Sequence, residues 1–148
     1  MRRTIVDTEC WLWWHLAPDR LGVRALELFE ERQAPLVLSA ASSWEIAIKV
    51  GLGKLVLPAP PDRFVPEQLA EDDIDALPIT HAHALRVAGL PDHHSDPFDR
   101  LLVAQSELER CAVLTADAQL AAYGIEIVWG GRDRVPPPPS HRSRRRRA

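Results

Sequence analysis

The chain has 148 residues, the length of one ordinary domain, and 46% of them are hydrophobic against 26% charged, so it can bury a sizeable core. Its two cysteines are too few for a disulfide scaffold, which favours a reducing, cytoplasmic compartment, and no apolar run approaches the ~18 residues of a membrane span. Together with a net charge of −3 and the lack of a signal-peptide pattern, this composition excludes a membrane protein, a secreted miniprotein and a collagen-like chain.

Short apolar runs alternate along the chain with stretches of helical pattern. Strands are predicted at residues 4–6, 36–38, 55–57, 74–79, 112–115 and 125–129. Helices are predicted at residues 11–14, 21–29, 39–50, 64–71, 81–88, 97–110 and 116–123. This alternation predicts an α/β domain in which a mostly parallel central sheet is flanked by helices on both sides.

Single residues mark several of the expected helix ends. Thr80 is a plausible N-cap, and Pro97 suits the first position of a helix. Gly51 and Gly53 are expected to end one helix and Gly124 another.

Acidic residues fall where the predicted strands end or where the helices after them begin. Asp7 directly follows the first strand, Asp117 follows the strand at 112–115, and Glu45 lies early in the helix after the second strand. Asp96 and Asp99 stand at the start of the helix at 97–110. Ligands of open parallel sheets bind beyond the carboxyl ends of the strands. Acids that converge there repel one another strongly without a cation, so the set favours a hard divalent metal.

Each acid taken alone also has a structural explanation. Asp96 and Asp117 can cap helices, Asp99 can be a first-turn acid, and Glu45 is placed to form an i, i+4 ion pair with Lys49. The apolar neighbours of Glu45 predict a largely buried helix, in which a carboxylate needs a partner. Asp7 is harder to explain by packing, because it ends a buried strand.

The stretches around these acids resemble a known family. They comprise residues 5–8, 12–14, 39–40, 43–49, 51–55, 77–80, 94–105 and 114–117, the longest of them containing the run Asp-Pro-Phe-Asp. In this order, over residues 4–129, they resemble PIN-domain proteins, specifically the VapC-type toxins of bacterial VapBC toxin–antitoxin pairs.

The resemblance implies a PIN-like fold and a magnesium-dependent endoribonuclease of a type II toxin–antitoxin system, with Mn²⁺ as a substitute ion. The implied catalytic acids and metal ligands are Asp7, Glu45, Asp99 and Asp117, and Asp96 matches an additional acid of the metal set. Glu9 departs from the pattern, because the family often has histidine there, and it adds negative charge near the site.

From the residues themselves we also expect Thr115 to position a ligand of the site, and Arg100 or Lys49 to meet a phosphate.

The resemblance also implies a VapB-like antitoxin partner, an RNA substrate and a homodimer. The helices at 11–14 and 21–29 are the expected partner surfaces. An alternative from another functional class is a catalytically silent PIN-like module that binds RNA or a protein. The complete set of acids argues against it, because a silent site gains nothing from their mutual repulsion.

Three weaker patterns are set aside. Residues 51–54 lack the spacing of a phosphate loop. The paired histidines lack a zinc partner, so we expect solvated or capping roles for His81, His83, His93 and His94. Tryptophan can stack on bases, but we expect core or interface roles for Trp11, Trp13, Trp14 and Trp44.

The carboxyl-terminal segment is expected to be a tail. Residues 132–148 carry seven arginines and one aspartate, and four consecutive prolines favour an extended chain. We therefore expect a nuclease domain over 1–131 and a disordered tail over 132–148. The tail is either an arm that attracts nucleic acid or a solvated terminus.

Overall fold

A single parallel sheet organises the molecule. The computed structural model describes residues 2–32 and 35–133. Within them, the sheet has the strand order β3-β2-β1-β4-β5, and all four pairings between neighbouring strands are parallel. The strands are β1 (Thr4–Val6), β2 (Leu36–Ser39), β3 (Asp75–Leu77), β4 (Ala112–Thr115) and β5 (Ile127–Trp129). The predicted α/β class is confirmed.

Helices occupy most of the segments between the strands. They are α1 (Thr8–Leu16), α2 (Val23–Glu31), α3 (Ala40–Gly51), α4 (Pro61–Asp72), α5 (His81–Arg86) and α6 (Pro97–Glu109). Shorter 3₁₀ helices cover Pro18–Arg20, Val87–Gly89 and Ala118–Tyr123. Among the described residues, none of the helices is both long and apolar enough to cross a membrane.

The strand predicted at 55–57 is wrong. This segment is an irregular connection between α3 and α4. Pro58, Pro60 and Pro61 follow it and have no N–H to donate to a ladder, which disfavours sheet pairing. The apolar pattern instead reflects packing, because Leu55 and Leu57 rest against the core beneath α4.

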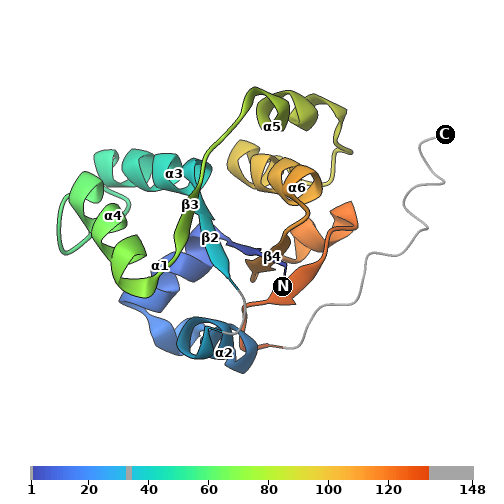
Figure 1. Ribbon diagram of the computed structural model, residues 1–148. Helices are drawn as coiled ribbons and strands as arrows, with labels where there is room; N and C mark the ends of the chain where they lie inside the picture. The colour runs from blue at the N-terminus through green and yellow to red at the C-terminus, as the bar shows by residue number, and fades with distance from the viewer. Residues whose placement is uncertain (1, 33–34, 134–148) are drawn as a thin grey trace.

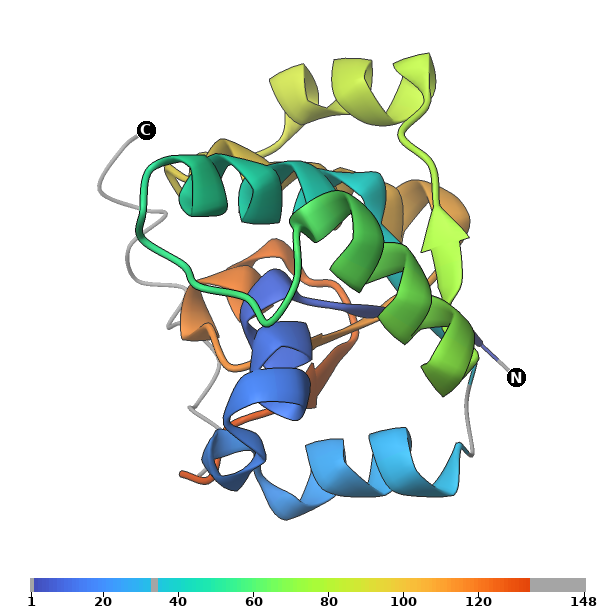
Figure 2. The ribbon, with the colours of Figure 1, turned by 90° about the vertical axis from the view of Figure 1, so that its left-hand side faces the viewer.

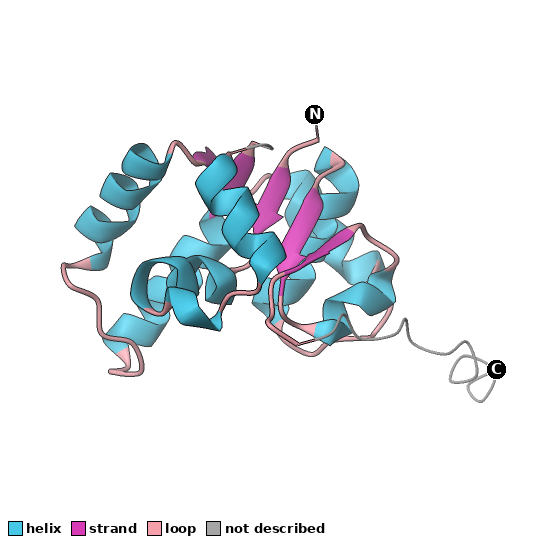
Figure 3. Ribbon diagram, turned by 90° about the horizontal axis from the view of Figure 1, so that it is seen from below, coloured by secondary structure: helices cyan, strands magenta, loops and turns pink. Residues whose placement is uncertain are grey.

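Two hydrophobic clusters lie on opposite faces of the sheet, because successive side chains of a strand point to opposite faces. In β1, Val6 belongs to the cluster that α1, α2 and α4 cover, whereas Ile5 belongs to the cluster that α6 covers. Leu114 and Val113 of β4 divide in the same way. Helices therefore flank both faces, as predicted (Figures 1 and 3).

Local hydrogen bonds explain where the helices begin and end. Ser39 caps α3, and Thr80 caps α5 in a capping box whose second member is His83. The predicted cap at Thr80 is thereby confirmed. In the chain order, β3 connects α4 to α5 (Figure 2). Gly53 and Gly124 have φ values of 72° and 76°, the left-handed conformation that ends a helix.

The chain remains in contact with the domain at the start of the predicted tail. The amide of Gly22 donates to the carbonyl oxygen of Gly130 over 2.9 Å, and Leu21 forms a bridge with Gly131. Arg132 donates to the carbonyl oxygen of Asp19 at 3.2 Å. The rest of the predicted tail, residues 134–148, lies outside the described residues.

Candidate functional site

The first part of the site is built on two neighbouring strands. β1 and β4 pair in register with Val6 opposite Leu114, so the residues after them meet at the same edge of the sheet. The hydroxyl of Thr115 donates to Oδ2 of Asp7 over 2.7 Å and accepts from the amide of Asp117 over 3.0 Å. Thr115 thus ties the acid that ends β1 to the acid that follows β4.

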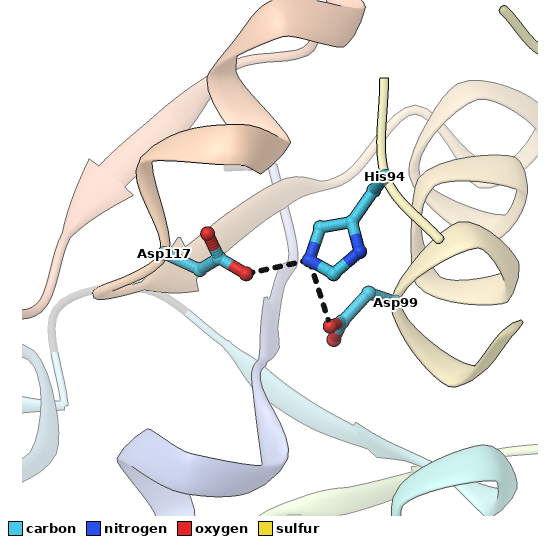
Figure 4. A group of neighbouring side chains, drawn as sticks. All are labelled: His94, Asp99 and Asp117. Carbon is cyan, nitrogen blue, oxygen red and sulfur yellow. Dashed lines mark hydrogen bonds and ion pairs between the residues drawn. The ribbon is translucent and has the colours of Figure 1, made fainter. Parts of the chain in front are cut away.

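The second part is a histidine between two of the predicted acids. Nε2 of His94 lies 2.7 Å from Oδ2 of Asp117 and 3.2 Å from Oδ2 of Asp99 (Figure 4). One possible ligand atom from each of these three residues lies within 4.8 Å of the other two. The side chains come from the loop before α6, the first turn of α6 and the residue group after β4, so the fold brings together segments distant in sequence.

Asp96 holds the start of α6 and positions His94. Its Oδ1 accepts from the amides of Phe98 and Asp99 at 2.8 and 3.1 Å, the geometry of an N-cap. Its own amide donates to Nδ1 of His94 over 3.0 Å. The capping explanation of Asp96 therefore describes its contacts, and the same turn orients the histidine.

Glu45 reaches the site from α3. Its carboxylate lies 3.1 Å from Nζ of Lys49, the i, i+4 ion pair foreseen as its structural explanation. The expectation that this helix is largely buried is wrong, because only one face of α3 is covered and Trp44, Ala47 and Ile48 are exposed. Ile46, which directly follows Glu45, is fully buried and packs in the core.

Two of the acids have strongly raised pKa values. Burial raises the pKa of Asp7 from 3.8 to about 6, opposed by the hydrogen bond from Thr115 and aided by the charges of Glu45 and Glu9. The pKa of Asp99 rises to about 8, first through burial and then through four other carboxylates. These are Asp7, Asp96, Glu45 and Asp117. All five predicted acids therefore act on one electrostatic site, and Glu9 adds to its negative charge.

This arrangement fits a divalent cation. Carboxylate oxygens are the ligands that Mg²⁺ and Mn²⁺ prefer, and the spacing of the oxygens on Asp99 and Asp117 suits a shared coordination sphere. Burial is the first cause of the raised pKa of Asp99, and a bound cation would offset the second cause, which is repulsion from the other carboxylates. Asp7, Glu45 and Asp96 do not belong to the group of ligand atoms within 4.8 Å, so their contact with an ion stays a prediction.

The two basic residues expected to meet a phosphate have partners within the domain. The guanidinium of Arg100 donates to the carbonyl oxygens of Pro91 and Val87, each over 3.0 Å, and to the hydroxyl of Tyr123 over 3.2 Å. These contacts fix the loop that carries His94. The approach of Arg100 or Lys49 to a phosphate stays a prediction.

His94 is the site residue that sequence reasoning missed. A solvated or capping role was expected for it, but it lies between Asp99 and Asp117. One signal for it was available in the sequence: His94 is two residues before Asp96, the expected cap of the helix that carries Asp99. A side chain so close to that helix start lies near the acids at this edge of the sheet. The capping prediction is confirmed for His83, whose ring is buried in the capping box.

The helices expected to form partner surfaces bury most of their apolar faces inside the domain. Trp11 of α1 is fully buried, Phe29 of α2 is nearly so, and Trp14 stacks on Phe29 with ring centroids 4.8 Å apart. By contrast, Trp44 on α3 is 59% exposed. Its ring and that of Phe98 pack edge to face, with their centroids 5.3 Å apart. Trp44 and Phe98 directly precede Glu45 and Asp99, so an aromatic pair borders the acids.

Two curated relatives are proteins of Mycobacterium tuberculosis named as ribonucleases. The chain is 27% identical to Ribonuclease VapC22 over 124 residues, which cover 83% of this chain and 93% of that protein. It is 43% identical to Ribonuclease VapC16 over 58 residues, which cover 38% of this chain and 41% of that protein.

Solved toxin–antitoxin complexes share the fold. VapBC2 from Rickettsia felis bound to promoter DNA has a chain that is 11% identical, with a TM-score of 0.64 over 86% of this chain and 98% of the other. A complex from Klebsiella pneumoniae has a chain that is 16% identical, with a TM-score of 0.60 over 85% and 96%. The sequence model of the PIN domain family matches residues 4–126 of this chain. The chain belongs to the PIN-domain family.

Proposed function

We propose that this protein is a divalent-metal-dependent endoribonuclease, the toxin of a type II toxin–antitoxin pair. The observation that carries the proposal is the convergence of five carboxylates at one edge of the sheet, which burial and mutual repulsion make costly without a cation. The names of the two ribonuclease relatives support RNA as the substrate. Mg²⁺ is the proposed ion, Mn²⁺ a substitute, and the cytoplasm the proposed compartment.

In this proposal Asp7 and Asp99 would hold the metal, and Asp117 and Glu45 would complete its shell directly or through water. The cation would supply Lewis-acid chemistry, which lowers the pKa of a water and offsets charge on the scissile phosphate. Carboxylates that do not bind the ion directly orient the attacking water and accept its proton. Thr115 keeps Asp7 in place through its 2.7 Å hydrogen bond.

The aromatic pair offers a place for the RNA bases. The exposed ring of Trp44 lies beside Phe98, and both residues directly precede acids of the site. Stacking of a base on an aromatic ring is worth about 1–3 kcal/mol and tolerates any sequence. A base stacked on Trp44 would hold the strand beside the carboxylates without fixing which RNA is cut.

A VapB-like antitoxin and a second copy of the chain are the proposed partners. The solved neighbours named above support this proposal, because they are toxin–antitoxin complexes. If a small open reading frame lies directly upstream of the gene, its co-expression with this chain, followed by copurification and mass measurement, tests both partners. Recovery of a lone monomer under these conditions would contradict both.

The test of the nuclease is cleavage of RNA by purified protein in Mg²⁺, Mn²⁺ or a chelator. We expect cleavage with either ion, none with the chelator, and none from Asp7→Asn or Asp99→Asn. Mapping of RNA 5′ ends in cells that express each form identifies the cut sites. If both variants bind RNA as the wild type does and no form cleaves it, the silent-module alternative is correct.

A further inference from the structure

We propose that His94 is a positioning residue and not a metal ligand: its Nε2 hydrogen is donated to Asp117 while Nε2 also lies against Asp99, which keeps the two acids together. The inference rests on the proposed metal-dependent function and assigns a role within that same site. It follows from the hydrogen bonds of the two ring nitrogens.

The backbone determines which nitrogen of His94 carries the hydrogen. The amide of Asp96 donates to Nδ1 over 3.0 Å, so Nδ1 must offer a lone pair. In a neutral imidazole the hydrogen is then on Nε2, which faces two carboxylate oxygens. Oδ2 of Asp117 accepts this hydrogen over 2.7 Å, and Oδ2 of Asp99 lies 3.2 Å from Nε2 as an ion-pair contact, so the hydrogen is satisfied without any further group.

A metal-ligating histidine would need the opposite arrangement. Nε2 would offer its lone pair to the ion, and the hydrogen on Nδ1 would point at an acceptor. Here Nδ1 faces the N–H of Asp96, which is itself a donor. Metal ligation through Nε2 would therefore set two hydrogens against each other, even though the spacing of His94, Asp99 and Asp117 suits an ion.

The donated hydrogen acts where the repulsion is strongest. Four other carboxylates repel the charge of Asp99, and the N–H of His94 lies between Asp99 and Asp117. A hydrogen bond uses one lone pair of a carboxylate oxygen and leaves another for a cation. His94 thus links Asp99, in the first turn of α6, to Asp117, two residues after β4. Both acids keep lone pairs that a metal can use.

The tautomer can be measured without metal. Long-range ¹H–¹⁵N spectra of the metal-free protein at pH 7.5 report the hydrogen position of each ring, and the signals lost in His94→Gln identify His94. We expect the Nε2–H tautomer. The Nδ1–H tautomer would overturn the proposal even if the protein binds metal and cleaves RNA.

Metal binding provides the second test. Mn²⁺ affinity is measured by electron paramagnetic resonance in the wild type, His94→Ala and His94→Gln, with the exposed His81→Ala as the matched control. We expect a loss of about tenfold for His94→Ala, near wild-type affinity for His94→Gln, whose amide also donates, and no change for the control. Spin-echo spectra of bound Mn²⁺ should show no directly coordinated nitrogen.

Each other outcome has a distinct meaning. Coordinated ¹⁴N in the wild type that His94→Ala abolishes would make His94 a ligand, and tighter Mn²⁺ binding by His94→Ala would make it a competitor of the ion. Either result overturns the proposal and leaves the nuclease assignment intact. A wild type that binds no Mn²⁺ and cuts no RNA would refute the proposed function, and the tautomer would still decide the hydrogen bonding of His94.

Discussion

Neutralising Asp99 should stabilise the metal-free protein. The side chain is 17% exposed, and burial, aided by the surrounding carboxylates, raises its pKa to about 8. In Asp99→Asn an amide of nearly the same shape replaces the acid, so the charge is removed while the packing is kept. The variant should therefore gain folding stability while it loses cleavage.

The raised pKa sets the size of the gain. The unfolded chain releases this proton near pH 3.8, whereas the folded protein retains it until about pH 8. At about 1.4 kcal/mol per unit, the acid lowers the free energy of unfolding by about 4 kcal/mol at pH 7. Burying the amide costs part of this, so we expect a gain of about 2 kcal/mol, or about 4–8 °C in melting temperature.

The sign of the pH dependence follows from the same shift. Between about pH 4 and pH 8 the folded protein binds more protons at Asp99 than the unfolded chain does, so wild-type stability falls as the pH rises. The gain from Asp99→Asn should accordingly be smaller at pH 5 than at pH 7.5. Thermal unfolding in a chelator at both pH values measures it, with Asp75→Asn on the exposed part of β3 as the matched control.

One result would refute this reasoning. If Asp99→Asn melts at or below the wild-type temperature at pH 7.5 while Asp75→Asn melts with the wild type, the carboxylate of Asp99 is not under repulsion. The electrostatic argument for a cation would then lose its basis.

Three further predictions concern the same edge of the sheet. Millimolar Mg²⁺ or Mn²⁺ should raise the wild-type melting temperature by mass action, and a flat response would contradict metal binding. Thr115→Val, which leaves Asp7 without its hydroxyl partner, should cost about 1–3 kcal/mol of unfolding free energy, whereas Thr115→Ser should cost less; equal losses would contradict the role of the hydroxyl. Trp44→Ala should weaken RNA binding by about 5- to 100-fold in a filter-binding assay and leave Mn²⁺ affinity unchanged, with the exposed Leu52→Ala as control. Equal RNA affinity of the two variants would exclude stacking on Trp44.

Strand patterns predicted most of the fold, because each buried strand is a short apolar run. The strand Ala112–Thr115 agrees with the structure at both ends, and the acids after β1 and β4 lie at one edge as expected. The prediction failed at 55–57, where Leu55 and Leu57 pack on the core from an irregular segment and Val56 is exposed. A run that short carries no periodicity to separate a strand from a buried loop.

The site was predictable only where regular elements position it. Asp7 and Asp117 follow from strand ends, and Asp99 follows from a helix start. His94 lies on a loop, where no helical or strand periodicity indicates which way a side chain points. Its partner Asp117 is 23 residues away along the chain. The tautomer that defines its role depends on one backbone amide, a contact that residue types alone do not reveal.

Backbone amides hold two of the acids at this edge in place. Oδ1 of Asp96 accepts hydrogen bonds from the amides that start α6, and Oδ1 of Asp117 accepts one from the amide of Gln119. Helix N-termini stabilise nearby negative charge, so the fold offsets part of the repulsion before any ion binds. Burial, together with the remaining repulsion, raises the pKa of Asp7 to about 6 and that of Asp99 to about 8. These two are therefore where a cation gains the most from binding, which is why their neutral variants discriminate best between a metal site and a set of caps.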